Sequence, residues 1–261
     1  MEQYRIRIAD PAENMTAFVL DEVPEHDYVR VATGILDKKE LKIEQVGFVK
    51  EPRLGGISRL EMMGGEFCGN AARSFGYMLC ENMGAAKGRV PIEITGCDRP
   101  LMVEADLAEG WACTDMPVPL GFDTLVIPEM GSLPVVVTEG ISHVILDGRK
   151  VDTMMIQMVL SQARKQLRFD ALGILFLREE YMFPVVYVRE TNSLVYESSC
   201  GSGSLACGCY RAREYEEGCF IYCFKQPGGA ITAQLNKEAG AVSQCQIEGR
   251  VSISDIMTVN L

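Results

Sequence analysis

The sequence predicts an α+β fold built from two duplicated, strand-rich domains, each of which encloses one helix. Short runs with period-two apolar spacing or β-branched content dominate both halves of the chain, and such runs are typical of strands. Two segments, residues 69–82 and 201–213, carry apolar or small side chains around most of their circumference, which is typical of buried helices. Each segment follows a cysteine and begins with a glycine and a small polar residue. This shared start indicates a duplication.

The expected strands form two similar series. In the first half they are residues 4–8, 16–20, 44–49, 59–63, 90–94 and 101–105, and in the second half residues 133–138, 143–146, 174–177, 183–188, 220–224 and 231–235. A third helix, residues 152–166, is expected on the surface. Pro117 and Pro119 interrupt the strand pattern between the halves. We therefore expect one domain at residues 1–117 and another at residues 118–261, from which the last strand can return to the first domain.

Composition and charge limit the classes of function. The chain has 261 residues, of which 48% are hydrophobic and 23% charged, enough to build an extensive core. Its formal net charge of -11 argues against binding to nucleic acid or to an anionic membrane surface. The N-terminus lacks the apolar run of a signal peptide, so we expect a cytoplasmic protein with reduced thiols. A homodimer is left open.

Cys68 and Cys200 directly precede the two expected buried helices. The unpaired amides and the positive dipole end of a helix N-terminus stabilise a thiolate and lower the pKa of a thiol. The same amides form a site for a substrate carboxylate. They belong to Gly69, Asn70, Gly201 and Ser202. An ordinary buried cysteine is the alternative at either position, but the matched pair favours function.

Two thiols at matched positions suit the inversion of an amino-acid α-carbon. Removal of the α-proton leaves a carbanion that fixed hydrogen-bond donors must stabilise. Inversion then needs a base on one face and an acid on the other, and two thiols can exchange these roles for the reverse reaction. The sequence therefore predicts an isomerase, an amino-acid racemase or epimerase that needs no cofactor and no metal.

The two cysteine elements resemble those of the diaminopimelate epimerase-like family. They are Phe67-Cys68-Gly69-Asn70-Ala71-Ala72-Arg73 and Cys200-Gly201-Ser202-Gly203-Ser204. The resemblance implies two pseudo-symmetric domains, each a mixed barrel-like sheet around a central helix, with neither metal nor coenzyme. It also implies substrate contacts for Asn14, in the first loop, and for Gln45.

One departure from this family concerns the substrate. Diaminopimelate epimerases carry an acidic residue followed by arginine before the second cysteine, and residues 191–197 contain no such pair. The chain is more similar to the branch that racemises histidine for metallophore synthesis. That similarity is found at residues 14–16, 44–48, 66–71, 197–203 and 226–229. It implies histidine as the substrate. A cationic or polar side chain suits an acidic pocket, and Glu44 is the candidate to contact it; the alternative for Glu44 is a solvated residue at a strand start.

Two further residues are candidates for proton transfer. His143 stands where the family has a histidine beside the first cysteine, and it could accept or relay the proton of Cys68. Glu197, three residues before Cys200, is a candidate base beside the second cysteine. A structural role for the histidine and an exposed position for the glutamate remain as alternatives.

Other functions remain open at this stage. The chain could racemise or epimerise another amino acid, of the diaminopimelate or the proline type, although in proline-type enzymes Gly-His follows the first cysteine. It could also be a non-catalytic protein of the same fold that binds an amino acid.

Overall fold

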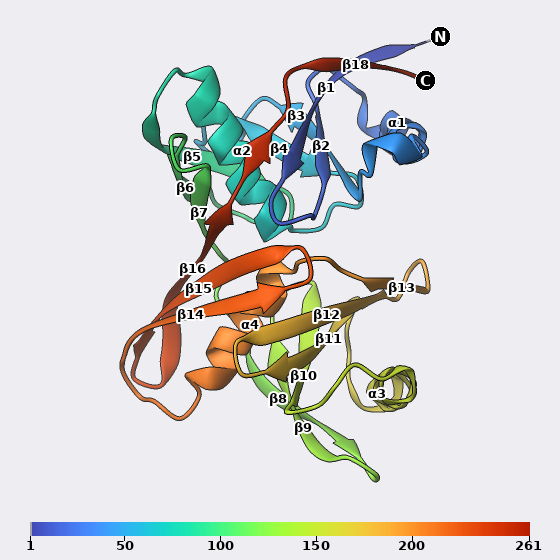
Figure 1. Ribbon diagram of the computed structural model, residues 1–261, viewed down its shortest axis with the longest axis vertical. Coiled ribbons are helices and arrows are strands. Elements are labelled where there is room, and N and C mark those ends of the chain that lie inside the picture. The colour runs from blue at the N-terminus through green and yellow to red at the C-terminus, as the bar shows by residue number, and fades with distance from the viewer. Residues whose placement is uncertain (1) are drawn as a thin grey trace. The chain divides into compact units, whose positions relative to one another are not determined.

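The computed structural model describes residues 2–261 and divides them into two compact units (Figure 1). The first unit contains the residues up to Asp115 together with Glu248–Leu261, and the second contains Met116–Ile247. The division thus falls two residues before the expected boundary. The returning segment begins at Glu248 and is longer than one strand.

The first unit is a mixed sheet around one helix. Its strands are β1 (Gln3–Asp10), β2 (Thr16–Val19), β3 (Gln45–Lys50), β4 (Arg59–Met62), β5 (Lys87–Ile94), β6 (Leu101–Asp106), β7 (Trp111–Asp115), β17 (Ser252–Ile253) and β18 (Met257–Asn260). The pairs β2–β3 and β4–β5 are parallel, and the other pairs from β1 to β7 are antiparallel. Both β17 and β18 pair antiparallel with β1. These pairings place the end of the chain in the first unit.

Helix α2 (Gly69–Asn82) is the buried helix of this unit, as the sequence predicts. It packs against β5, β6 and β7, and Phe75 meets Phe18 edge to face with ring centroids 5.8 Å apart. A Cβ at Gly76 would overlap the side chain of Val103, so the glycine allows helix and strand to approach closely. The opposite face of the sheet is covered by α1 (Tyr28–Leu36), which the sequence did not predict.

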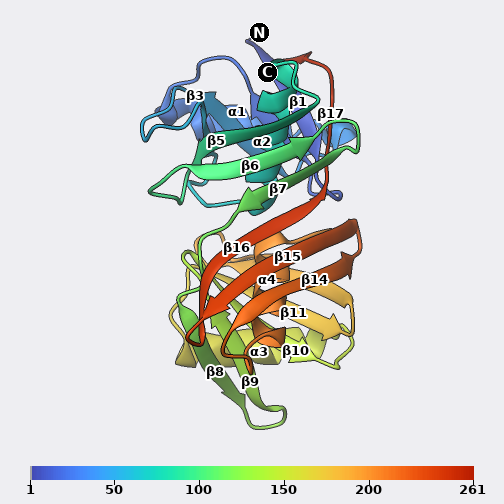
Figure 2. The ribbon, with the colours of Figure 1, turned by 90° about the vertical axis from the view of Figure 1, so that its left-hand side faces the viewer.

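The second unit repeats this layout with different connections. Its strands are β8 (Gly121–Ile127), β9 (Gly131–Val137), β10 (Ile141–Asp147), β11 (Ala171–Arg178), β12 (Tyr181–Val188), β13 (Ser193–Tyr196), β14 (Gly218–Gln226), β15 (Gly229–Glu238) and β16 (Ala241–Arg250). Figure 2 shows β14, β15 and β16 side by side over α4 (Gly201–Arg211). The pairs β10–β11 and β12–β14 are parallel.

One further helix covers the outer face of the second unit. Helix α3 (Thr153–Gln166) begins where the side chain of Asp152 accepts a hydrogen bond from the Met155 amide at 2.9 Å. Its buried residues, among them Ile156 and Val159, pack against β8 and the core. Short 3-10 helices complete the elements at Glu25–Asp27 and Lys39–Leu41. Among residues 2–261, no helix has the length and apolar content needed to cross a bilayer.

The close contact at Gly76 gives a first prediction. We expect Gly76→Ala to lower the free energy of unfolding by about 1–3 kcal/mol, because the added methyl group overpacks the contact with Val103. Urea unfolding followed by circular dichroism measures this change.

The matched control is Gly208→Ala in α4. There the added Cβ would meet the Cβ of Ala233 at 3.3 Å, a much milder contact than at Gly76. Both substitutions gain about 1 kcal/mol of helix propensity, so their difference reports the contact alone. Equal effects of the two substitutions would contradict the close approach at Gly76.

Candidate active site

Cys68 and Cys200 occupy the same position in their two units, the N-cap of the buried helix. Cys68 has φ -129° and ψ 110°, and Cys200 has φ -131° and ψ 113°. Both residues are therefore extended and point the chain into the first helical turn. The predicted placement of the two cysteines at helix starts is confirmed.

The thiol of Cys68 lies against the first turn of α2. Its Sγ accepts a hydrogen bond from the Ala71 amide at 3.4 Å, and the side chain is half-buried. Gly96, with φ +76°, packs so closely on the backbone of Phe67 that any Cβ there would clash. This contact fixes the loop that leads into Cys68.

Four predicted substrate-binding residues of the first unit join in one hydrogen-bond network. The Oδ1 of Asn14 accepts hydrogen bonds from Gln45 Nε2 at 3.1 Å and from Asn70 Nδ2 at 3.3 Å. The Nδ2 of Asn14 donates to Glu44 Oε2 at 3.1 Å. The structure therefore brings the early asparagine, the start of β3 and the start of α2 together. Within the described chain, the buried Oε1 of Gln45 has no hydrogen-bond partner.

Asn14 is placed by a strained turn between β1 and β2. Ala12 and Glu13 both have left-handed backbones, with φ of 67° and 59°. The turn is closed by the Glu13 amide, which donates to Asp10 Oδ1 at 2.7 Å. Such conformations in non-glycine residues cost on the order of 1 kcal/mol each and are concentrated at functional sites.

Glu44 is exposed overall but presents its carboxylate to the network. Partial burial of the carboxyl group raises the pKa of Glu44, and the hydrogen bond from Asn14 opposes that rise. Its expected contact with the substrate side chain stays a prediction.

Arg73 is a residue of this site that the sequence did not single out. Its side chain is 0% exposed. The guanidinium donates to Asn70 Oδ1 through Nε (3.3 Å) and Nη2 (3.2 Å), to the Arg250 carbonyl (2.9 Å) and to the Pro11 carbonyl (3.3 Å). Burial lowers the pKa of Arg73 to about 10, and the nearby Cys68 acts in the opposite direction. The available signal was an arginine within a segment of mostly apolar or small residues.

The thiol of Cys200 has a different environment. Burial raises its pKa well above the ordinary value, and the charge and hydrogen bond of Glu197 raise it further, against smaller effects of Ser202 and the Gly203 amide. The expectation that a helix start lowers the pKa is therefore wrong for Cys200, because burial and a neighbouring carboxylate outweigh the helix amides. Glu197 does lie beside this cysteine, as expected.

Gln226, at the end of β14, holds the backbone of Cys200 in place. Its Oε1 accepts a hydrogen bond from the Cys200 amide at 2.7 Å, and its Nε2 donates to Ser204 Oγ at 2.9 Å. The Ser204 hydroxyl in turn donates to the Cys200 carbonyl at 2.8 Å. The resemblance included Gln226, but the sequence alone did not indicate this role.

His143 lies in β10 and is fully buried. Its Nε2 is 3.2 Å from Ser202 Oγ, which is 3.5 Å from Cys200 Sγ. Gly173 on the neighbouring β11 leaves room for the ring, because a Cβ there would overlap it. Burial lowers the pKa of His143 to about 3, so the imidazole is neutral at physiological pH. The pairing of His143 with Cys68 stays a prediction.

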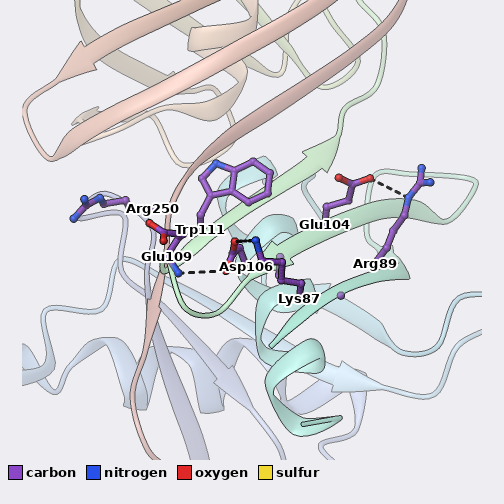
Figure 3. A pocket seen from close by; sticks show the side chains of 9 residues that line it. Lys87, Arg89, Glu104, Asp106, Glu109, Trp111 and Arg250 are labelled. Carbon is purple, nitrogen blue, oxygen red and sulfur yellow. Dashed lines mark hydrogen bonds and ion pairs between the residues drawn. The ribbon is translucent and has the colours of Figure 1, made fainter. Parts of the chain in front are cut away.

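Two cavities, one in each unit, have linings that include neither Cys68 nor Cys200. A cavity of about 730 Å³ in the first unit is lined by residues of β5, β6 and β7, Glu109 and Arg250, with ion pairs Lys87–Asp106 and Arg89–Glu104 along its wall (Figure 3). A second cavity, of about 400 Å³, borders Gln226 in the second unit. Among residues 2–261, no three histidine, cysteine, aspartate or glutamate side chains are grouped so as to hold a metal ion.

Comparison with known proteins gives consistent matches. The sequence profile described as the histidine racemase CntK N-terminal domain matches residues 6–258. A histidine racemase of Staphylococcus aureus is 26% identical over 257 residues, covering 93% of this chain and 92% of the relative. A histidine racemase of Fusobacterium nucleatum is 30% identical over 213 residues, covering 77% of this chain and 78% of the relative. These matches agree with the resemblance to histidine racemases.

A solved structure supports the fold. A hydroxyproline epimerase from Agrobacterium vitis superposes with a TM-score of 0.71 at 11% identity, covering 99% of this chain and 91% of that chain. At this identity the likeness establishes the mixed α+β fold and nothing of the substrate. The wider diaminopimelate epimerase-like family has support at this level of fold alone.

The carboxylate beside Cys200 gives a second prediction. We expect Glu197→Gln to lower the pKa of Cys200, because the substitution removes a neighbouring negative charge. A change of one pKa unit corresponds to about tenfold faster alkylation at a given pH below the titration midpoint. Iodoacetamide labelling of the Cys200 peptide, followed by mass spectrometry across a pH series, measures it.

Two controls accompany this labelling. Glu190→Gln makes the same change of net charge at an exposed position and should leave Cys200 unaffected. The exposed Cys219 should label equally in all variants. An unchanged or slower reaction of Cys200 in Glu197→Gln would count against the interaction.

The buried imidazole gives a third prediction, on pH and stability. Between pH 3 and about 6.5, the unfolded chain binds a proton at residue 143 and the folded chain does not. Lowering the pH through this window therefore destabilises the fold, by up to about 1.4 kcal/mol per pH unit from this group. We expect His143→Gln to remove that part of the slope in urea unfolding between pH 4 and 6.5.

Imidazole NMR signals provide an independent check. The His143 ring signals should stay constant from pH 8 to pH 5, and His26→Gln identifies them by elimination, since the chain has two histidines. Titration of the His143 signals near pH 6 would overturn the assignment of a neutral ring.

Proposed function

We propose that this chain, which belongs to the histidine racemase CntK family, interconverts L- and D-histidine by proton exchange with Cys68 and Cys200. As an amino-acid racemase it is an isomerase. The observation that carries the two-thiol proposal is the matched N-cap geometry, in which both cysteines begin a buried helix with nearly the same backbone angles. A catalyst that inverts a centre needs one such group for each face.

The proposed reaction has two proton transfers. The thiolate of one cysteine takes the α-proton and becomes a thiol, while the C–H electron pair passes to the α-carbon and the carboxylate. The thiol of the other cysteine gives its proton to the opposite face and becomes a thiolate. The raised pKa of Cys200 supports its assignment as the proton donor of the first turnover, with Cys68 as the base. The reverse reaction exchanges the roles.

The hydrogen-bond network of the first unit supports a site for the amino acid. Asn14, Gln45 and Asn70 are held in fixed orientations by their mutual hydrogen bonds. We assign them to the polar groups of the substrate, and Glu44 to its imidazole side chain. The helix-start amides of Gly69, Asn70, Gly201 and Ser202 are assigned to the substrate carboxylate.

The second unit supplies a proton path to Cys200. The carboxylate of Glu197 accepts a hydrogen bond from the protonated thiol of Cys200, and Ser202 connects Cys200 with the neutral His143. We propose that these two side chains reset the protonation of Cys200 between turnovers. In this proposal the two units are pseudo-symmetric halves, each a barrel-like sheet around its cysteine-capped helix.

A fourth prediction tests the reaction and the substrate together. Reduced protein is incubated with L-histidine in heavy water, and proton NMR follows the α-proton signal while chiral chromatography follows the D enantiomer. We expect loss of the α-proton signal and formation of D-histidine. Proline, 4-hydroxyproline and diaminopimelate form the comparison panel.

The outcomes separate the alternatives. If another amino acid exchanges its α-proton and histidine does not, the proposed reaction stands and the proposed substrate is wrong. Binding of histidine without exchange of its α-proton would indicate a non-catalytic amino-acid-binding protein and would overturn the proposal.

The cysteines themselves are tested in the same assay. Cys68→Ser and Cys200→Ser should each lower racemisation by about 10²–10⁴-fold or more, because a hydroxyl group is a far weaker base than a thiolate. The control is Cys219→Ser, an exposed cysteine of the second unit, which should leave the rate unchanged. Near-normal rates in either active-site variant would exclude the two-thiol mechanism.

A further inference from the structure

We propose that the cavity of about 400 Å³ in the second unit binds a small soluble anion that carries a phosphate group. The lining of this cavity includes neither of the two cysteines at the helix starts. The inference therefore goes beyond the proposed racemase reaction, and binding can be measured without turnover.

The charged side chains that line this cavity are all positive. They are Arg149, Lys150, Arg178 and Lys225, and no carboxylate of residues 2–261 lines it. The cavity of the first unit is different, because three basic and three acidic residues line it and two ion pairs join them. Four cations together are a local reversal of the net charge of -11 of the chain. Such a concentrated positive field attracts anions.

Three carboxylates near these cations in the sequence have other partners. Asp147 accepts a hydrogen bond from Tyr210 Oη at 3.2 Å, and Asp152 caps α3. Glu180 lies 2.6 Å from Lys225 Nζ and neutralises that lysine. The other three basic residues of the lining take part in no ion pair within the described chain. The positive charge of the cavity is therefore largely uncompensated.

Backbone hydrogen bonds hold together the three segments that carry the four cations. The Gly148 amide donates to the Leu177 carbonyl at 2.8 Å, which joins the loop after β10 to the end of β11. The Lys225 amide donates to the Glu180 carbonyl at 2.7 Å, which joins β14 to the turn before β12. The fold thus places like charges next to one another, and a bound anion would relieve their mutual repulsion.

Aromatic side chains of the lining favour an organic phosphate. Phe176 is buried in the core cluster beneath α3, and the half-buried Phe183 packs against that cluster. Tyr181 is exposed, and Lys225 Nζ lies 5.3 Å from the centroid of its ring. Arginine and lysine recognise phosphate through charge-assisted hydrogen bonds. A volume of about 400 Å³ is within the range of small-molecule sites, about 300–1,000 Å³, which combine apolar walls with a few polar groups.

The net charge of the chain favours a small ligand over a polymer or a lipid surface. A nucleic acid or an anionic membrane would meet the negative charge of the remaining surface, because the whole chain carries -11. A small anion that enters the cavity meets the local cations instead. The ligand class is therefore a soluble phosphate compound.

The cavity is distinct from the surroundings of the Cys200 thiol. Leu175 of β11 faces α4, where a Cβ at Gly203 would come within 3.1 Å of it. The next residue, Phe176, points to the opposite face of the sheet, because side chains alternate along a strand. Gln226 is shared, since it lines the cavity and its side chain accepts the hydrogen bond of the Cys200 amide. We therefore expect histidine and the phosphate ligand to bind without competition.

The experiment is isothermal titration calorimetry of the full chain at physiological ionic strength with adenosine 5′-monophosphate, pyrophosphate and adenosine. We expect dissociation constants below about 1 mM for the two phosphate compounds and no binding of adenosine in this range. Lys150→Gln and Arg178→Gln should each weaken binding of both compounds by about tenfold, the effect of one charge-assisted hydrogen bond. Both residues are exposed, so neither substitution removes a buried contact.

The matched control is Arg89→Gln, which removes an exposed arginine from the cavity of the first unit and should leave binding unchanged. The proposal would be overturned if neither phosphate compound binds with a dissociation constant below about 10 mM. Equal affinities of the wild-type chain and both cavity variants would also contradict it. So would binding of adenosine as tight as that of its monophosphate, or displacement of the monophosphate by excess L-histidine. None of these results depends on racemisation, so the proposed function would stand.

Discussion

The enclosure of a helix with no polar face is the constraint on which each unit depends. A helix such as α2 is stable only if strands cover its whole circumference, because its apolar side chains have no side that water can solvate. The backbone amides of its first turn have no partner within the helix and are available for chemistry. Cys68 and Cys200 cap these turns in their respective units. The same architecture that buries the helices thus leaves the amides of their first turns outside the helical hydrogen-bond pattern.

Equal backbone geometry does not give equal chemistry. The sulfur of Cys68 shares the first turn of α2 with the Ala71 amide and lies near a buried guanidinium. The sulfur of Cys200 lies beside a carboxylate in a more deeply buried position. Neighbouring charges interact strongly in the low-dielectric interior of a protein. The two units therefore supply two cysteines with the same backbone geometry, and the neighbouring side chains give their thiols different surroundings.

The sequence predicted the buried helices well and much of the sheet. Helix α2 has the predicted bounds, residues 69–82, and α4 ends at Arg211, two residues before the predicted end. Strands β7, β8, β13, β16, β17 and β18 and helix α1 were not among the predicted elements. The α1 segment contains β-branched residues, and its helical state follows from packing against β3, which local propensity does not encode.

The sequence predicted which residues lie at the candidate site but not the electrostatic environment of these residues. Asn14, Gln45 and Asn70 were identified from motifs, and the structure joins them in one network. The environment of Arg73 depends on carbonyls 62 and 177 residues away in the sequence. The pKa of Cys200 depends on its degree of burial, which a helix-start motif does not report. Long-range packing therefore decided both features.

The close approach at Gly76 has a mechanical consequence for the first cysteine. Gly76 follows Cys68 by eight residues, so the contact lies about 12 Å along the helix axis from the thiol. A tilt of the helix by about 5° at this contact would therefore move the sulfur by about 1 Å over that length. Displacements of this size can cost about 100-fold in rate. In the proposed reaction, a glycine two turns from the thiol thus limits how far the sulfur of Cys68 can move.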